Sequence, residues 1–308
     1  MNADILARGL PGLLGPVWRL SPPYEIEPIA GGMNSVVVGV ALPVARYVAK
    51  WVPQVDRAAL HAGARASQII TRGGLAAGEP VFTRDGSITV DFAGGVVALM
   101  SYVPGAPLQS LPRDQPLLGK TLARAHTIAG TEKRRGPLFP FLVDPATPGS
   151  TMEPWVRLAL ASVQAEYRSL PPLTWGLLHG DPAPEAFRLD PETGRVGLID
   201  WAAATRGPLL YDVASTVMYL GGDTAARSFL GVYAAAGPLP TDEMGAHLSA
   251  MRRYRGAVQA AYFAGRLARH DLTGIADEEE NWKGLHDARD MLKELGMPAL
   301  RRRDGAGS

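Results

Sequence analysis

The chain has 308 residues, which is enough for two domains or two lobes around a sizeable core. Its 31 lysine and arginine residues nearly balance its 30 aspartate and glutamate residues, so the net charge of +1 gives no overall field that would attract nucleic acid or an anionic membrane. Cysteine is absent, which excludes disulfides, cysteine-bound zinc and thiol nucleophiles and fits a cytoplasmic location.

The first segments predict helix and then strand. Residues 2–20 have helical composition interrupted by Pro and Gly, and they lack a basic segment before an apolar core, so we expect no signal peptide. Strand-forming residues then flank the small-residue turn 30–35, a pattern typical of a β-hairpin. Glycine lets a backbone approach phosphates and a serine hydroxyl can donate to them. Gly32, Asn34 and Ser35 are therefore candidates for nucleotide binding, and the alternative is an ordinary turn.

The next predicted strand, 47–52, carries Lys50 in an otherwise apolar run, where an unpaired ammonium group would be costly. Lys50 could face water at a sheet edge, where lysine prevents aggregation, or it could bind a phosphate, which the preceding hairpin favours. A helix is expected at 57–71. Further strands are expected at 79–83, 87–92 and 96–102. The uncharged run 92–112 contains several Gly and Pro residues, so it predicts no membrane span.

The second half of the chain has a mainly helical pattern. Residues 118–129 have helical spacing, and His126 among them is expected in the core or at a helix end rather than in catalysis. The long predicted helix 243–270 carries arginines that are expected on its solvated face, namely Arg252, Arg253, Arg255, Arg266 and Arg269.

Two acidic residues, Asp181 and Asp200, mark the most informative segment. Each follows a short apolar run, 177–178 or 196–199, and the connecting residues 190–194 have turn chemistry. A hairpin of the two runs would bring both carboxylates to one edge of a sheet. They would repel each other unless something neutralised them, and a divalent metal with phosphates is the usual remedy, so the segment indicates phosphoryl transfer.

Three motifs of this segment resemble those of a known family. They are His179-Gly180-Asp181, Ile199-Asp200-Trp201 and Gly207-Pro208-Leu209-Leu210-Tyr211-Asp212-Val213-Ala214. In order and spacing they are similar to the motifs of the aminoglycoside phosphotransferase and choline kinase family, small-molecule relatives of the protein kinases. The resemblance implies an α+β, two-lobe protein-kinase-like fold. Residues 1–103 would form a small antiparallel-sheet lobe that binds the nucleotide, and residues 104–308 a larger, mainly helical lobe for catalysis and substrate binding.

The resemblance also implies a role for each motif residue. Asp181 would accept the proton of the substrate hydroxyl or orient that hydroxyl for attack. Asp200 would bind Mg²⁺ together with the phosphates of ATP. His179 and Asp212 would support the catalytic loop structurally.

In the N-terminal lobe the resemblance implies two further contacts. Lys50 would pair with the α- and β-phosphates of the nucleotide, and backbone groups near Met100 and Tyr102 would hydrogen-bond the adenine. The family's helix after this strand supplies a Glu that orients the lysine. The corresponding helix here has none, and His61 and Gln68 are the possible substitutes.

A second departure from the family concerns the metal. Ala186 stands where the family has an Asn, and an alanine side chain cannot coordinate Mg²⁺. Glu185 is adjacent and carries a carboxylate, so it is the candidate for the second metal ligand. The alternative is that Glu185 faces solvent and the protein is catalytically impaired.

Together these features predict an ATP- and Mg²⁺-dependent phosphotransferase that acts on a hydroxyl of a small molecule: an antibiotic such as an aminoglycoside, an amino alcohol or a sugar. The alternative is a catalytically degenerate kinase-like protein that binds nucleotide. A hydrolase is poorly supported, because the chain has neither a Gly-x-Ser-x-Gly elbow nor a histidine pair at metal-ligand spacing. We expect a cytoplasmic monomer or homodimer with no nucleic-acid or membrane partner.

Overall fold

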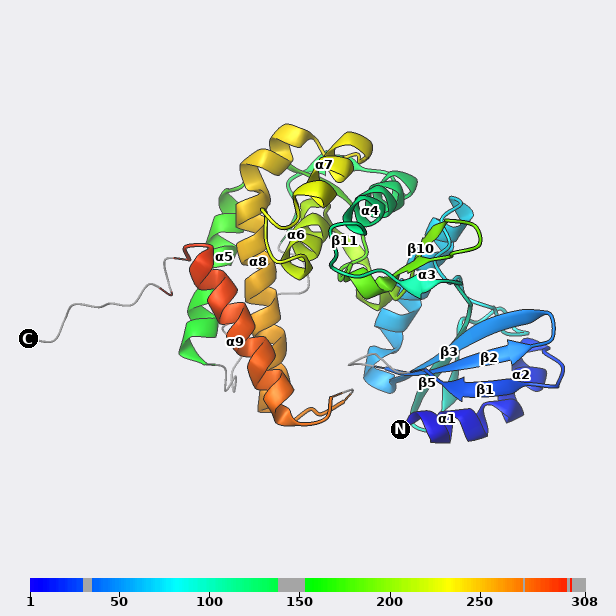
Figure 1. The fold of residues 1–308 in the computed structure, drawn as a ribbon. Coiled ribbons are helices and arrows are strands. Elements are labelled where there is room, and N and C mark those ends of the chain that lie inside the picture. Colours follow the sequence, from blue (N-terminus) through cyan, green and yellow to red (C-terminus); the bar gives the residue numbers. More distant parts are fainter. Residues whose placement is uncertain (30–34, 138–152, 274, 298–299, 301–308) are drawn as a thin grey trace, which may run out of the picture.

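Valine- and alanine-rich runs after residue 35 form the core strands of the N-terminal sheet. The structure, a computed structural model, describes residues 1–29, 35–137, 153–273, 275–297 and 300. Its five-stranded antiparallel sheet has the order β1-β2-β3-β5-β4 (Figure 1). The strands are β1 (Glu25–Pro28), β2 (Val36–Leu42), β3 (Ala45–Pro53), β4 (Thr89–Phe92) and β5 (Gly95–Ser101).

Two short helices, α1 (Ala3–Gly9) and α2 (Pro11–Trp18), pack on this sheet. Their apolar residues recur every four positions, so they share one face that is buried against the sheet. This face consists of Leu6, Leu10, Leu14 and Trp18. The sequence predicted this helical region, and the structure divides it into two helices.

Helix α3 (Arg57–Arg72) contributes to the cores of both lobes. Leu60 and Ala64 pack with residues of the N-terminal sheet, whereas Ala66 and Ile70 belong to the large core of the C-terminal lobe. Figure 1 shows α3 running from the edge of the sheet toward the helical lobe. One helix therefore ties the two lobes together. The proposed lobe boundary at residue 103 stays a prediction.

The larger lobe is mainly helical. Its helices are α4 (Gln115–Ala129), α5 (Pro154–Ser169), α6 (Leu210–Tyr219), α7 (Arg227–Ala236), α8 (Thr241–Ala268) and α9 (Glu278–Glu294). The long helix α8 packs against α5, α6 and α9 (Figure 1). This arrangement confirms the α+β, two-lobe protein-kinase-like fold expected from the sequence. Among the described residues, no helix combines the length and the apolar character that a membrane span needs.

Two small sheets of this lobe correct the predicted hairpin. The sequence paired 177–178 with 196–199, but the hairpin consists of β9 (Phe187–Leu189) and β10 (Val196–Leu198), which form a sheet with β6 (Ala106–Pro107). The turn between them closes through hydrogen bonds of Asp190, so it pairs the residues that directly flank it. Residues 177–178 instead belong to β8 (Leu173–Leu178), which lies between β11 (Thr205–Pro208) and β7 (Glu132–Arg134).

The segment 79–83 is not a regular strand. Pro80 forms an isolated bridge with Met100, and proline has no backbone N–H with which to extend a ladder. Thr83 then begins a turn, in which its side chain and backbone bond to Ser87, so that β4 starts only at Thr89.

Candidate active site

The loop after β8 holds His179 and Asp181. Its backbone is fixed by Asp212 in the first turn of α6, whose two carboxylate oxygens accept the N–H groups of His179 at 2.7 Å and of Gly180 at 2.9 Å. The side chain of His179 is buried, and its Nε2 donates to the carbonyl oxygen of Ile199 at 2.8 Å. His179 and Asp212 thus join the loop of Asp181 to the segment that carries Asp200. Their role as supports of catalysis stays a prediction.

Gly180 brings the two loops into direct contact. Its φ is +89°, and a Cβ added there would lie 2.2 Å from the carbonyl oxygen of Ala203. Both the conformation and the space therefore require glycine. Ala203 ends the short 3₁₀ turn Trp201–Ala203 that directly follows Asp200, so the loops of Asp181 and Asp200 pack against each other.

The side chain of Asp212 is in turn fixed by His126. Its side chain is fully buried, and Oδ2 lies 3.1 Å from Nε2 of His126. The other ring nitrogen of His126 lies 2.7 Å from the hydroxyl of Tyr233. Burial, together with the charges of Asp212 and Glu243, raises the pKa of Tyr233, so its hydroxyl stays protonated. His126 is buried, as its helical spacing predicted.

Asp181 has two protein partners that the sequence did not suggest. Its side chain is about half exposed, and Oδ1 accepts hydrogen bonds from the hydroxyl of Tyr219 at 2.6 Å and from Nη2 of Arg255 at 3.1 Å. Tyr219 is the last residue of α6, and Arg255 lies on α8. The carboxylate of Asp181 is therefore ion-paired to α8.

The prediction that the α8 arginines lie on a solvated face is wrong for Arg255 and Arg266. Both are buried, with 7% and 0% exposure. The sequence did contain a signal, because Arg255 falls on the same helical stripe as Met251 and Val258, which are also buried. A charged residue on an apolar stripe needs a polar partner, and Asp181 supplies it.

Lys50 on β3 reaches across to the C-terminal lobe. Its Nζ lies 2.6 Å from Oδ1 of Asp200, with 15% exposure for the lysine side chain and 52% for the aspartate. Burial alone would raise the pKa of Asp200, but the ammonium group of Lys50 outweighs it and lowers that pKa. The backbone of Asp200 is left-handed, with φ +64°, a conformation that aspartate tolerates better than most residues.

The predicted substitutes for an orienting glutamate have other partners. Nε2 of His61 lies 3.1 Å from the hydroxyl of Thr89, and Gln68 accepts from Arg65. The contribution of α3 is instead one of packing. A Cβ added at Gly63 would lie 2.4 Å from the carbonyl oxygen of Trp201, so the helix backbone rests directly on the turn after Asp200.

Among the residues predicted to bind the nucleotide, Met100 and Ser35 lie on or next to β5 and β2, the two strands that flank β3 with Lys50. Met100 on β5 pairs with Val48 on β3, two residues from Lys50. The N–H of Tyr102 donates to the carbonyl oxygen of Arg46 at 3.1 Å, and the guanidinium of Arg46 lies 4.5 Å from the centre of the Tyr102 ring. Ser35 precedes β2, whereas Gly32 and Asn34 lie outside the described residues. The nucleotide contacts of all five candidates therefore stay predictions.

Glu185 is exposed on the turn Pro184–Ala186, and the carbonyl oxygen of Ala186 accepts the N–H of Ile199 at 2.9 Å. The charge of Glu185 contributes to the raised pKa of Tyr219, after burial and the charge of Asp181. Within the described part of the chain, no cluster of three acidic or histidine side chains could enclose a metal. Mg²⁺ needs only one or two carboxylates when phosphates complete its coordination, so the half-exposed Asp200 fits such a role.

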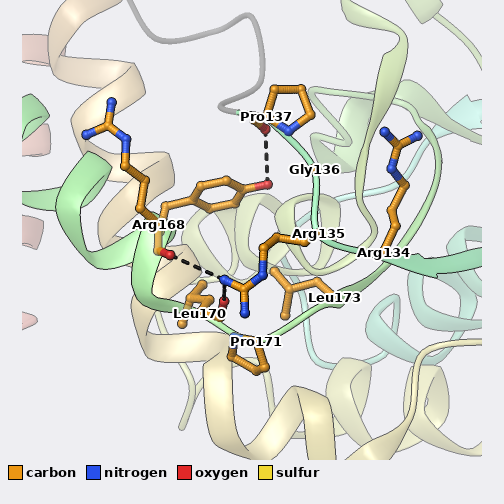
Figure 2. A pocket seen from close by; sticks show the side chains of 9 residues that line it. Arg134, Arg135, Gly136, Pro137, Arg168, Leu170, Pro171 and Leu173 are labelled. Carbon is orange, nitrogen blue, oxygen red and sulfur yellow. Dashed lines mark hydrogen bonds between the residues drawn. The ribbon is translucent and has the colours of Figure 1, made fainter.

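A pocket of about 390 Å³ lies elsewhere in the C-terminal lobe (Figure 2). Arg134, Arg135 and Arg168 contribute to its lining, and Figure 2 shows Arg135 bonded to the carbonyl oxygens of Arg168 and Leu170. Burial raises the pKa of Tyr167 in its wall to about 12. The lining contains none of the carboxylates described above. This pocket is therefore separate from the candidate active site.

Comparison with known proteins identifies the family. The profile of the phosphotransferase enzyme family matches residues 25–255, and the chain belongs to this family. A protein of Deinococcus radiodurans, described as uncharacterized, is 32% identical over 226 residues. That match covers 63% of this chain, and the chain spans only 62% of the length of this relative.

Solved structures share the fold at low sequence identity. The amicoumacin kinase hAmiN, in complex with AMP-PNP, Ca²⁺ and Ami, aligns with a TM-score of 0.68 at 13% identity over 93% of both chains. The microcompartment-associated aminopropanol kinase aligns with a TM-score of 0.68 at 18% identity, over 97% of this chain and 99% of its own. The choline kinase LicA from Streptococcus pneumoniae aligns with a TM-score of 0.62 at 18% identity, over 94% of this chain and 98% of its own.

These comparisons confirm the resemblance to the aminoglycoside phosphotransferase and choline kinase family. The kinase neighbours, at 13–18% identity, show that the fold is shared.

Proposed function

We propose that the protein is a kinase that transfers the γ-phosphoryl group of ATP to a hydroxyl group of a small molecule. One arrangement carries this proposal. Lys50 from the nucleotide lobe pairs with Asp200, and the loop of Asp200 packs directly against the loop of Asp181. Contiguous elements thus supply the groups that phosphoryl transfer requires: a cation for the phosphates, a carboxylate for a metal and a carboxylate for the acceptor hydroxyl.

In the proposed reaction Asp181 orients the acceptor hydroxyl toward the γ-phosphorus. The acceptor oxygen forms a bond to phosphorus while the bond to the β–γ bridging oxygen breaks, and ADP leaves with that oxygen. The hydroxyl proton passes to the carboxylate of Asp181 or to the product phosphate. Because the transition state is loose, positioning contributes more than base strength, and the half-exposed carboxylate of Asp181 can provide it.

Asp200 is the residue proposed to hold Mg²⁺, with Glu185 as the second carboxylate. The bound ion would neutralise charge on the β- and γ-phosphates. Lys50 would share its ammonium group between Asp200 and the phosphates, since an ammonium has three donors and Asp200 occupies one of them. His179 and Asp212 would hold the loop of Asp181 at the correct distance from the nucleotide.

The acceptor class is proposed from the neighbours. They include kinases named for an antibiotic, an amino alcohol and choline, all of them small molecules with a hydroxyl group. An antibiotic, an amino alcohol and a sugar are the candidate acceptors, and a role in antibiotic resistance follows if the acceptor is an antibiotic. A cytoplasmic location agrees with a supply of ATP.

A catalytically degenerate nucleotide-binding protein is the second candidate. Ala186 lies where the family has a metal-binding Asn, which favours this alternative. ATP binding measured by calorimetry with and without Mg²⁺, followed by phosphorus NMR of ATP with a panel of alcohols, separates the two. The kinase requires tighter binding with Mg²⁺ and a new phosphate-ester signal with at least one alcohol. Binding that Mg²⁺ does not change, with no ester from any alcohol, would favour the degenerate protein.

A further inference from the structure

Among the described residues, the protein donors to the carboxylate of Asp181 bond to one of its oxygens, Oδ1. Oδ1 accepts from the Tyr219 hydroxyl at 2.6 Å and from Nη2 of Arg255 at 3.1 Å, and these two donors lie 3.4 Å from each other. Across the described residues, no protein donor bonds to Oδ2. The two oxygens of Asp181 therefore have different surroundings, and Oδ2 is the one that faces no competing protein donor.

The guanidinium group of Arg255 is anchored before it reaches Asp181. Its Nε donates to Oγ of Ser215, which is fully buried, at 2.9 Å, and its Nη1 donates to Oε1 of Gln259 at 3.3 Å. The group also lies 5.9 Å from the ring centre of Tyr219. With three of its nitrogens bonded to groups on α6, α8 and the catalytic loop, the planar guanidinium has a fixed orientation.

The charge of Arg255 persists in this buried position. Burial lowers the pKa of the guanidinium, but Tyr211, Asp181 and Tyr219 around it outweigh burial and raise that pKa. A charged donor holds a carboxylate more strongly than a neutral one. Tyr219, the second donor, keeps its hydroxyl proton, because burial and the charges of Asp181 and Glu185 raise the pKa of Tyr219.

We propose that Arg255 and Tyr219 are positioning residues that hold Oδ1 of Asp181 and thereby present Oδ2 to the acceptor hydroxyl. The proposal rests on the proposed kinase function. Neither residue needs to touch the acceptor. Both act through the orientation of one carboxylate, so their loss slows the chemical step and leaves nucleotide binding intact. A misplacement of about 1 Å costs roughly 100-fold in rate, which sets the scale of the expected effect.

The geometric part of the proposal can be tested without any turnover. Nitrogen NMR of the arginine side chains reports whether the guanidinium of Arg255 is bonded. We expect slowly exchanging Arg255 signals in the wild type that shift in Asp181→Asn, whereas the signals of Arg253 do not. Arg253 is the matched reference, because it lies two residues away on α8 and pairs with Glu166 at 3.0 Å instead. If the Arg255 signals do not shift in Asp181→Asn, the proposal is wrong, whether or not the protein proves to be a kinase.

The functional part compares four variants once an acceptor is found. Tyr219→Phe and Arg255→Gln should lower kcat by about 10- to 100-fold, with the nucleotide Kd and the Tm near the wild-type values. Arg255→Lys should recover part of kcat, because an ammonium restores the charge but not the planar geometry. Arg253→Gln is the control and should keep the wild-type kcat.

The outcomes distinguish positioning from mere structural support. If Tyr219→Phe and Arg255→Gln both retain the wild-type kcat, the proposal is wrong. If kcat, nucleotide affinity and Tm fall together in Arg255→Gln, with no recovery in Arg255→Lys and no loss of kcat in Tyr219→Phe, then Arg255 only stabilises the fold. If the wild type phosphorylates no alcohol, the kinase function fails, while the NMR comparison still decides whether Arg255 holds Asp181.

Discussion

Lys50 and Asp200 lie 150 positions apart in the chain, yet their side chains form a 2.6 Å ion pair between the two lobes. The lysine comes from the middle of a sheet in the N-terminal lobe, and the aspartate follows a hairpin strand of the C-terminal lobe. The pair joins the two lobes, and it links the charge of Asp200 to the position of Lys50.

Removing Lys50 should therefore raise the pKa of Asp200. In the wild type the ammonium group holds this pKa below its ordinary value. The pair thus adds stability above the unfolded-state pKa of about 3.9, and this stability is lost as the pH falls through the folded-state value. In Lys50→Met burial is opposed only by His179 and the backbone N–H of Ala202, so the pKa of Asp200 should move upward. Carbon NMR titration of the aspartate carboxylates measures it, with Lys120→Met, an exposed lysine on α4, as the control. An unchanged pKa of Asp200 in Lys50→Met would contradict the ion pair between Lys50 and Asp200.

Replacing Gly63 should destabilise the protein, because α3 contacts the turn after Asp200 at this residue. In Gly63→Ala the new methyl group would meet the carbonyl of Trp201, so we expect a loss of about 1–3 kcal/mol in the free energy of unfolding and weaker nucleotide binding. Gly231→Ala on α7 is the matched control. It has open space around the new methyl and should gain about 0.5–1 kcal/mol from helix propensity. Urea unfolding compares the two, and equal effects would refute the close packing of α3.

Gly180→Ala should damage the catalytic loop more than backbone strain alone can. Both Gly180 and Gly194 have a positive φ, so alanine at either position costs about 1–2 kcal/mol. Only at Gly180 would the methyl group also collide with the carbonyl of Ala203. Gly180→Ala should thus unfold at lower urea concentration than Gly194→Ala and lose turnover, which Gly194→Ala should retain. Equal stability of the two variants would show that the loops of Asp181 and Asp200 are not in contact.

Glu185→Gln should raise the Mg²⁺ concentration needed for half-maximal nucleotide binding by about tenfold, if Glu185 replaces the missing Asn as a ligand. Glu192→Gln removes the same charge from the exposed turn 190–194 and is the control. Calorimetric titrations with ATP at several Mg²⁺ concentrations give the comparison. Glu185→Gln with an unchanged Mg²⁺ dependence would leave Asp200 as the single carboxylate of the proposed metal site.

The sequence predicted the two-lobe fold class correctly because short-range signals indicate a strand-rich first part and a helical second part. Turn residues and apolar runs indicate strands and hairpins, and His179, Asp200 and Asp212 lie in motifs with a recognisable order. The predicted hairpin failed because residues 177–178 and 187–189 both carry large apolar side chains, and periodicity does not say which strand will pair with 196–198.

Arg255 was missed for a different reason. A charged residue on an amphipathic helix is normally solvent-exposed, so the pattern placed it on the polar face. Its partners Ser215 and Asp181 precede it by 40 and 74 positions, and only the packing of α8 on α6 brings them together. The helical stripe shared with Met251 and Val258 indicates burial of Arg255, but local sequence does not identify partners at such separations.

The central claim, that Asp181 directs the γ-phosphoryl group to an alcohol, is tested most directly by following that group. The wild type and Asp181→Asn are incubated with γ-labelled ATP, Mg²⁺ and a pool of small-molecule alcohols, and the labelled products are separated. We predict a labelled phosphate ester with the wild type, a fall of roughly 10²- to 10⁴-fold with Asp181→Asn, and the same nucleotide affinity for both. Label transferred to an alcohol equally well by Asp181→Asn would contradict the account.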